Sequence, residues 1–170
     1  MMYGGTHGFC FQDNMCLSTK SGNANRLNTG VGRIPKFDSE SRGGRMLLLA
    51  DDEALIGLLV RPHLEKAGFQ TVFADNGARA VELAIRNVPE LIILDIVMPE
   101  MDGLAVLRLL KWSESTRLVP VIIVSATYDH VIHEEAKKCG AAGFLTKPFS
   151  PAQLLAEIRR VMGGAALGGR

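Results

Sequence analysis

The stretch Leu91–Gly103, which reads LIILDIVMPEMDG, decides how the rest of the chain is interpreted. Its first four residues are apolar and lead directly into one acid, Asp95, and Pro99 and a turn-forming MDG follow. A continuous apolar run of this kind is typical of a strand that is buried on both faces. A charged carboxylate at the end of such a strand raises the free energy of the fold unless something pairs with it. The sequence therefore predicts partners for Asp95 elsewhere in the chain.

Four further segments resemble this strand, and helical patterns lie between them. We predict strands at residues 46–50, 69–74, 91–95, 119–126 and 143–146. The first helical pattern keeps the spacing i, i+3, i+4, i+7, i+8 of one helix face, in Ile56, Leu59, Val60, His63 and Leu64. Strands that alternate with helices predict a parallel sheet with helices on both faces.

The first and last predicted helices carry further local signals. Pro62 removes one hydrogen bond inside the first helix, but it falls opposite the apolar stripe, which predicts a kink on the solvent side. Ser150 as N-cap and Pro151 at the first helical position begin the last helix. We expect Gly163-Gly164 to end it.

Three polar or aromatic residues on the middle helices are given structural interpretations. Trp112 is predicted to pack at the end of the third helix. His130 and His133 lie at i, i+3 on one helix, but the HExxH spacing of a metal site is absent. We therefore interpret both histidines as part of a solvated helix face.

The pattern divides the chain into three parts. Residues 1–45 are rich in glycine and small polar residues without sustained periodicity, so we interpret them as a disordered N-terminal extension. The hypothesis is that Met46 is the biological start and that this extension is not native. A single domain then spans residues 46–163, and residues 164–170 form a short flexible tail.

Composition excludes some classes of protein. The chain has 170 residues and a formal net charge of +1, so no global field favours nucleic acid. Its apolar runs are shorter than the ~20 residues of a membrane span. Its three cysteines, an odd number, favour free thiols in a reducing cytosol over a disulfide framework. We therefore expect a cytoplasmic protein that binds neither nucleic acid nor membrane.

Polar residues follow several of the predicted strands where each strand ends. In an open parallel sheet these ends form the edge at which ligands bind. That edge receives Asp51, Asp52, Asp95, Ser125 and Lys147. Three close carboxylates need a cation, and hard oxygen ligands suit Mg²⁺. A lysine and a hydroxyl beside them suit phosphoryl oxygens, which predicts a phosphoryl-transfer site with a carboxylate nucleophile.

Residues 46–162 resemble the receiver domain of two-component response regulators. The matching segments are LLLADDE, LDIVMPEMDG, VIIVSA and GAAGFLTKPF, in this order. The resemblance implies an α/β (βα)5 flavodoxin-like fold, a doubly wound parallel sheet with strand order 2-1-3-4-5. It also implies a signalling phosphoacceptor that is not an enzyme beyond its own phosphorylation and dephosphorylation.

The resemblance assigns a role to each matching position. Asp95 is the expected phosphoacceptor, and Ser125 and Lys147 are expected to contact the phosphoryl group. Magnesium would be held by Asp52 directly, by Asp51 through water, by Asp95, and by the backbone carbonyl of Val97. Phe144 occupies the position of the switch aromatic, which turns inward when the serine moves toward the phosphoryl group.

The resemblance also implies partners. A sensor histidine kinase or histidine phosphotransfer protein would supply the phosphoryl group. A downstream protein would bind the face formed by the fourth helix, the fifth strand and the fifth helix. Because only one helix follows the lysine, we expect a stand-alone receiver in a two-component or phosphorelay pathway. It would be a monomer or a weak phosphorylation-dependent dimer.

Two alternative functions use the same residue types. One is a phosphatase with an aspartate nucleophile, but its D-x-D pattern places a second acid where this chain has Val97. The other is a pseudo-receiver that binds partners without taking phosphate, although all the required side chains are present.

Val97 also cannot orient an attacking water, so we expect a comparatively long-lived phosphorylated form.

Overall fold

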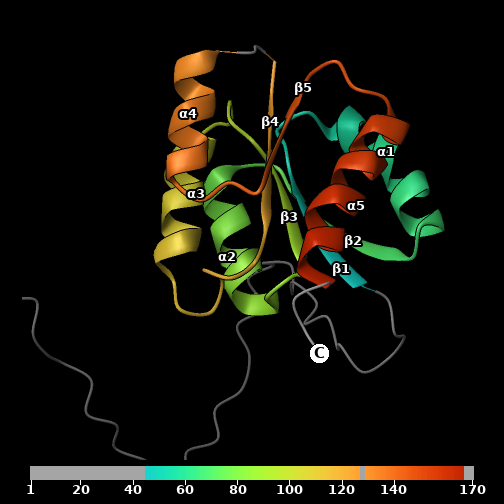
Figure 1. Cartoon of the computed structure of the whole chain (residues 1–170), viewed down its shortest axis with the longest axis horizontal. Helices are drawn as coiled ribbons and strands as arrows, with labels where there is room; N and C mark the ends of the chain where they lie inside the picture. Colours follow the sequence, from blue (N-terminus) through green and yellow to red (C-terminus); the bar gives the residue numbers. More distant parts are fainter. Residues whose placement is uncertain (1–44, 127–128, 167–170) are drawn as a thin grey trace, which may run out of the picture. The chain divides into compact units, whose positions relative to one another are not determined.

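The computed structural model describes residues 45–126 and 129–166, in which strands and helices alternate (Figure 1). The strands are β1 (Arg45–Ala50), β2 (Phe69–Ala74), β3 (Leu91–Asp95), β4 (Val121–Ser125) and β5 (Gly143–Thr146). The helices are α1 (Ala54–Lys66), α2 (Gly77–Asn87), α3 (Gly103–Trp112), α4 (His130–Lys138) and α5 (Pro151–Ala166). The predicted N-terminal extension, except for Arg45, and the last four residues of the predicted tail lie outside the described residues.

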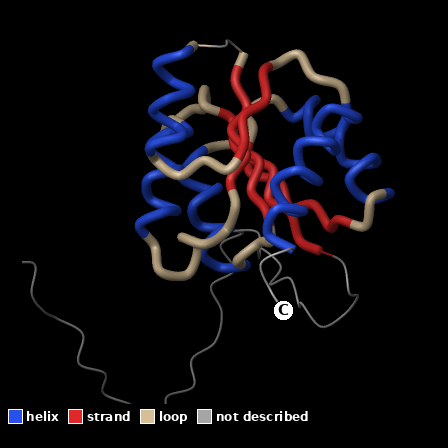
Figure 2. Tube along the Cα trace, in the orientation of Figure 1, coloured by secondary structure: helices blue, strands red, loops and turns tan. Residues whose placement is uncertain are grey.

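The strands form one parallel sheet in the order β2-β1-β3-β4-β5, which confirms the expected topology. Figure 2 shows the strands together in the middle, with helices to either side. Helices α1 and α5 lie together on one face, and α2, α3 and α4 cover the other (Figure 1). The central strand β3 is buried along its whole length, as its continuous apolar sequence predicts.

The core facing α1 and α5 takes alternate residues from the strands, because successive side chains of a strand point to opposite faces. Leu49, Ile93 and Ile122 are each at most 1% exposed and belong to this cluster, as do Val60 and Leu64 of α1. Burying an aliphatic side chain of this size contributes roughly 1.5–3 kcal/mol. These contacts fix α1 and its preceding loop against the end of β1.

The apolar stripe of α1 is narrower than predicted. Only Val60 and Leu64 of the five predicted residues are buried, and Ile56 is partly buried. Leu59 is 63% exposed and His63 is exposed as well, because the sheet and α5 cover one side of this helix alone. Pro62 lies within the helix on its exposed side, as predicted.

The start of α5 agrees with the sequence signals, and its end does not. Ser150 and Gln153 form a capping box, in which the Gln153 backbone N–H donates to Ser150 Oγ at 3.2 Å and the Ser150 N–H donates to Gln153 Oε1 at 2.8 Å. The prediction that Gly163-Gly164 end α5 is wrong, since the helix continues to Ala166. Glycine weakens a helix by about 1 kcal/mol but does not forbid its backbone geometry.

The packing role predicted for Trp112 is also wrong, because this side chain is 87% exposed. The buried residues of α3 are Gly103, Val106, Leu107 and Leu110, which follow the i, i+3, i+4, i+7 pattern. Trp112 lies two positions beyond Leu110, or about 200° around the helix, and therefore faces away from the sheet.

The strand boundaries differ slightly from the prediction. Strand β4 begins at Val121 rather than at residue 119, since Pro120 has no N–H and Val119 donates its own N–H to Thr116 at 2.9 Å. Strand β1 begins at Arg45, which pairs in register with Phe69 and forms an ion pair with Glu90 at 2.8 Å. None of the helices described is both long and apolar enough to cross a membrane.

Candidate functional site

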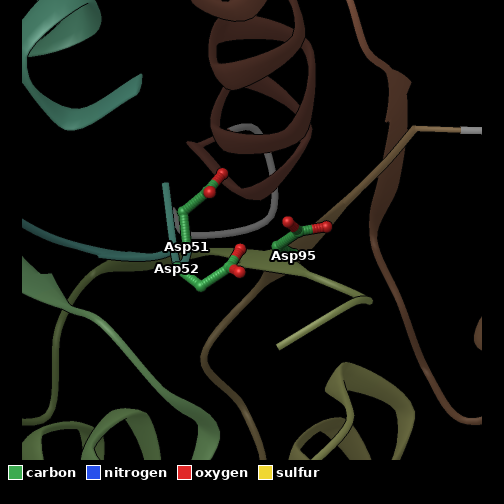
Figure 3. A group of neighbouring side chains, drawn as sticks. All are labelled: Asp51, Asp52 and Asp95. Atoms are coloured by element: carbon green, nitrogen blue, oxygen red, sulfur yellow. The ribbon is translucent and has the colours of Figure 1, made fainter. Parts of the chain in front are cut away.

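Three carboxylates meet where β1 and β3 end. The two strands are neighbours in register, with Ala50 paired with Leu94, so Asp51 comes to lie beside Asp95. One oxygen atom from each of Asp51, Asp52 and Asp95 lies within 4.8 Å of the others. Figure 3 shows these side chains gathered at the strand ends. Asp51 and Asp95 are buried, whereas Asp52 is exposed and open to approach from solvent.

Lys147 is the cation that pairs with this acidic cluster. Its Nζ lies 2.7 Å from Asp95 Oδ2 and 2.8 Å from Asp51 Oδ2. The lysine side chain is only 12% exposed. The backbone N–H of Lys147 donates to the Ser125 carbonyl at 2.7 Å, which anchors the loop after β5 to the end of β4. The partner that the apolar run before Asp95 predicts is therefore 52 residues away in sequence.

Burial and pairing act in opposite directions on these groups. Burial raises the pKa of Asp51 above its ordinary value, and hydrogen bonds from Lys147 and the Glu53 backbone lower it by less. Burial lowers the pKa of Lys147, but the carboxylates of Asp51 and Asp95 raise it by more, so the net shift is upward. Lys147 is therefore charged at neutral pH and offsets the repulsion between the two buried acids.

The remaining predicted residues of the site occupy neighbouring positions. Ser125 is the last residue of β4 and is 4% exposed, and Asp95 pairs in register with Val124 just before it. The backbone N–H of Val97 donates to Asp95 Oδ1 at 3.4 Å. The Val97 side chain is 68% exposed, so it stands at the open side of the cluster.

The loop after Asp95 turns back tightly on β3. The Gly103 N–H donates to the Ile96 carbonyl at 2.8 Å. A Cβ atom on Gly103 would lie 2.0 Å from the backbone oxygen of Asp95, so only glycine allows this approach. Asp102 caps α3 by accepting from the Ala105 N–H at 2.9 Å. The MDG sequence therefore fixes the backbone that carries Asp95.

Glu100 adopts an unusual backbone conformation within that loop. Its φ is +68°, and the Met101 N–H donates across it to the Pro99 carbonyl at 2.8 Å. This three-residue arrangement is the rare γ-turn with positive φ, which is strained for a residue with a side chain. The strain is located between the phosphoacceptor candidate and α3.

Phe144 lies on β5 outside the acidic cluster and is partly buried. Its ring is edge-on to the ring of His133, with centroids 4.8 Å apart and planes at 70°. The interpretation of His133 as part of a solvated face is therefore wrong, whereas His130 is exposed. In the part of the chain that the structure describes, the three aspartates are the only grouping suited to a metal, and neither histidine belongs to it.

One residue and one contact near these positions are absent from the sequence prediction. Glu53 Oε1 lies 3.6 Å from Lys147 Nζ, and its place directly after Asp51 and Asp52 in the sequence was the available signal. The contact between His133 and Phe144 had no such signal, because it depends on how α4 packs against β5.

Comparisons with known proteins agree with this geometry. Residues 47–159 match the family described as the response regulator receiver domain. The phosphate regulon transcriptional regulatory protein PhoB of Pseudomonas aeruginosa is 34% identical over 119 residues, which are 70% of this chain and 52% of that protein. This chain thus spans about half the length of PhoB.

Solved structures show the same fold. The chemotaxis response regulator CheY4 of Vibrio cholerae has a TM-score of 0.66 and 29% identity, covering 69% of this chain and 98% of that one. The receiver domain of the sensor histidine kinase PA1611 from Pseudomonas aeruginosa PAO1 has a TM-score of 0.65 and 28% identity, covering 71% and 98%. Its structure has a magnesium ion coordinated in the active site cleft. With its sheet order, its acidic strand ends and this match, the chain belongs to the response regulator receiver domain family.

Proposed function

We propose that Asp95 of this chain accepts a phosphoryl group and that the protein acts as a response regulator in a two-component or phosphorelay pathway. The observation that supports this most directly is the pairing of buried Asp95 with Lys147 at 2.7 Å, beside two further acids at the carboxyl edge of the sheet. Burying carboxylates raises the free energy of the fold. A role of Asp95 as the nucleophile in phosphoryl transfer explains why the chain carries them at this position.

The donor atoms at this edge fit a magnesium ion. Three carboxylates offer hard oxygen ligands within 4.8 Å of one another, and Mg²⁺ is commonly held by one or two carboxylates with waters and phosphate oxygens. Asp52, Asp95 and the carbonyl of Val97 would hold the ion, with Asp51 acting through water. The bound ion would neutralise the negative charge of the phosphoryl oxygens.

The residues of the chain then have distinct roles in the transfer. A carboxylate oxygen of Asp95 forms the new bond to phosphorus while the bond to a histidine nitrogen of the donor breaks. The donor imidazole leaves with the electron pair of that bond and takes a proton from water. The ammonium group of Lys147 forms an ion pair with one phosphoryl oxygen, and the Ser125 hydroxyl donates a hydrogen bond to another.

An apolar surface beside the site suits a protein donor. Leu55 and Leu58 of α1 are each 70% exposed, and Leu59 is 63% exposed. Leu59 and Lys147 both line an open cavity of about 460 Å³ that continues to Phe149 and Pro151. Because Lys147 also contacts Asp95, a histidine kinase or phosphotransfer protein packed on these leucines would present its phosphohistidine to the phosphoacceptor.

The side chain of Val97 is proposed to lengthen the phosphorylated state. It stands exposed beside Asp95 and has no group that could orient an attacking water. Val97→Asn should therefore shorten the lifetime of the acyl phosphate in a dephosphorylation assay, whereas Val97→Ala should leave it nearly unchanged. Equal decay rates in the wild type and the asparagine variant would exclude this role.

The downstream features remain proposals of the same kind. We propose that the α4–β5–α5 face binds a protein target, that Phe144 switches that face, and that the protein is a cytoplasmic monomer or weak dimer. PhoB is a transcriptional regulatory protein, and this chain spans about half its length. We also propose that this domain acts through protein contacts and does not itself bind nucleic acid.

Acetyl phosphate with Mg²⁺ tests the central claim. Intact mass spectrometry should show one added phosphoryl group, which Asp95→Asn abolishes and Asp75→Asn, an exposed aspartate at the end of β2, leaves in place. A phosphatase would instead release inorganic phosphate with steady turnover. A pseudo-receiver would gain no phosphoryl group even though its circular dichroism shows a folded protein.

A further inference from the structure

Two different helices hold Phe144, one through its ring and one through its backbone. On the side of α4, the His133 ring meets the Phe144 ring edge-on, with centroids 4.8 Å apart. On the side of α5, the Phe144 backbone N–H donates to the Glu157 carboxylate. The side chain and the backbone of the predicted switch residue are therefore controlled by separate elements.

The backbone contact belongs to a larger arrangement, the edge clasp, formed by Glu157 and Arg160. Among the described strands, β5 pairs with β4 alone, so its outer edge carries backbone groups that none of these strands satisfies. Arg160 binds both oxygens of Glu157, at 2.6 and 2.8 Å, and donates to the Ala142 carbonyl at 3.0 Å. The edge clasp thus satisfies the carbonyl of Ala142, just before β5, and the N–H of Phe144 within it.

Gly143 is what allows the edge clasp to lie this close. A Cβ atom at this position would stand 2.4 Å from Glu157 Oε1 and 3.2 Å from the Arg160 guanidinium. The Arg160 interaction also lowers the pKa of Glu157, as expected for a carboxylate paired with a cation. The backbone of β5 is therefore fixed to α5 by a charged pair as well as by apolar packing.

The aromatic side of Phe144 has more room. An open cavity of about 310 Å³ is lined by His133, Lys137 and Phe144, and both residues of the edge clasp also line it. A ring can turn beside such a space without displacing backbone, whereas an N–H held by a carboxylate cannot move without breaking its hydrogen bond.

We propose that the ring of Phe144 acts on α4 through His133, while its backbone stays fixed to α5 through the edge clasp. The edge clasp keeps the backbone of β5 and the helix α5 in place, while His133 transmits a turn of the Phe144 ring to α4. His133 is thus a positioning residue that couples the switch to α4, and α4 moves relative to an unchanged α5. This inference rests on the proposed phosphorylation of Asp95.

Beryllofluoride with Mg²⁺, used as the probe in place of a phosphoryl group, tests the coupling by amide NMR of the full chain. In the wild type we expect shift changes at Asp95 and across α4, and small ones in α5. His133→Ala should lose most of the α4 changes while its phosphorylation by acetyl phosphate stays at the wild-type level. His133→Phe, which keeps a ring, should restore them, and His130→Ala, an exposed histidine of the same helix, should behave as the wild type.

A second variant tests the edge clasp. Glu157→Ala should speed hydrogen exchange of the Phe144 amide and extend the beryllofluoride-induced shifts into α5, and Arg159→Gln, the neighbouring exposed arginine, should do neither. Unaltered α4 shifts in His133→Ala, or α5 shifts in the wild type as large as those of α4, would overturn the inference. Failure of the proposed function is distinguishable, because the Asp95 region of the wild type would then show no response at all.

Discussion

Replacing Lys147 by methionine should make the stability of the protein depend strongly on magnesium. Methionine keeps most of the volume of the side chain but removes its charge. The Nζ atom it removes lies 2.7 and 2.8 Å from two carboxylates whose side chains are 5% and 2% exposed. Asp51 and Asp95 would then be buried next to each other without a counter-charge.

The size of the effect follows from this geometry. At 2.7 Å and an effective dielectric constant of about 20, each contact corresponds to about 6 kcal/mol of attraction, most of which offsets the cost of burying the charges. Breaking one partner of a buried ionic group typically costs about 3–5 kcal/mol. Burial already raises the pKa of Asp51, so proton uptake limits the loss to the lower end of this range. A loss of about 3 kcal/mol lowers the melting temperature by roughly 6–12 °C in a chain of this size.

Urea denaturation followed by far-ultraviolet circular dichroism, with EDTA or with Mg²⁺, measures both parts of the prediction. Magnesium at a hundredfold excess over its dissociation constant stabilises a protein by about 2.7 kcal/mol. In Lys147→Met the ion should recover most of the loss and bind more tightly than in the wild type, because no lysine competes for the carboxylates. The control is Lys111→Met, since Lys111 is also partly buried but donates to the backbone carbonyls of Arg117 and Val119. Equal magnesium effects in the wild type and Lys147→Met would refute the reasoning.

Three further variants test other parts of the structure by the same denaturation method. Gly103→Ala should cost at least about 1–3 kcal/mol and slow phosphorylation, because its Cβ would meet the Asp95 carbonyl; Gly163→Ala, where a Cβ meets nothing within 4 Å, should be neutral or stabilising. Glu100→Gly should stabilise the fold by about 0.5–1 kcal/mol, because relief of strain at φ +68° exceeds the added freedom of the unfolded chain, and a destabilised variant would count against a strained turn. For Glu157 the arginine partner lowers the carboxyl pKa in the folded state, so its stabilisation is present above the ordinary pKa of a carboxyl group and disappears as pH falls through the folded value. Glu157→Gln should therefore cost about 0.5–1 kcal/mol at neutral pH and nothing in acid, and a constant difference across that range would contradict the assignment.

The strands and the acidic site could be predicted from the sequence because both depend on local features. A continuous apolar run identifies β3 without knowledge of its neighbours, and the parallel arrangement then brings Asp51 and Lys147 to Asp95. Trp112 and Leu59 were placed wrongly because apolarity shows only that a side chain could be buried. Which face of α1 or α3 meets the sheet depends on the crossing of the helices.

The contact of His133 with Phe144 and the edge clasp depend on tertiary structure in the same way. His130 and His133 lie three residues apart on the same helix, yet the ring of His133 meets an aromatic ring and His130 faces solvent. The edge clasp needs a carboxylate and a guanidinium three residues apart, a spacing that also occurs on fully solvated helices. The edge clasp can reach β5 because Gly143 has no side chain to keep it away from the strand.

Trp112 is the only tryptophan in the sequence, and its 87% exposure makes it an indole that is already hydrated in the native state. The wavelength of its maximum fluorescence emission should therefore change little when the protein unfolds, whereas that of a tryptophan buried in a core shifts to the red. The same exposure makes Trp112 a sensitive intrinsic fluorescence probe of binding at the end of α3. A blue shift of the emission on mixing with another protein would identify the C-terminal end of α3 as a place of contact. This end of the helix is the one farther along the chain from the acidic site.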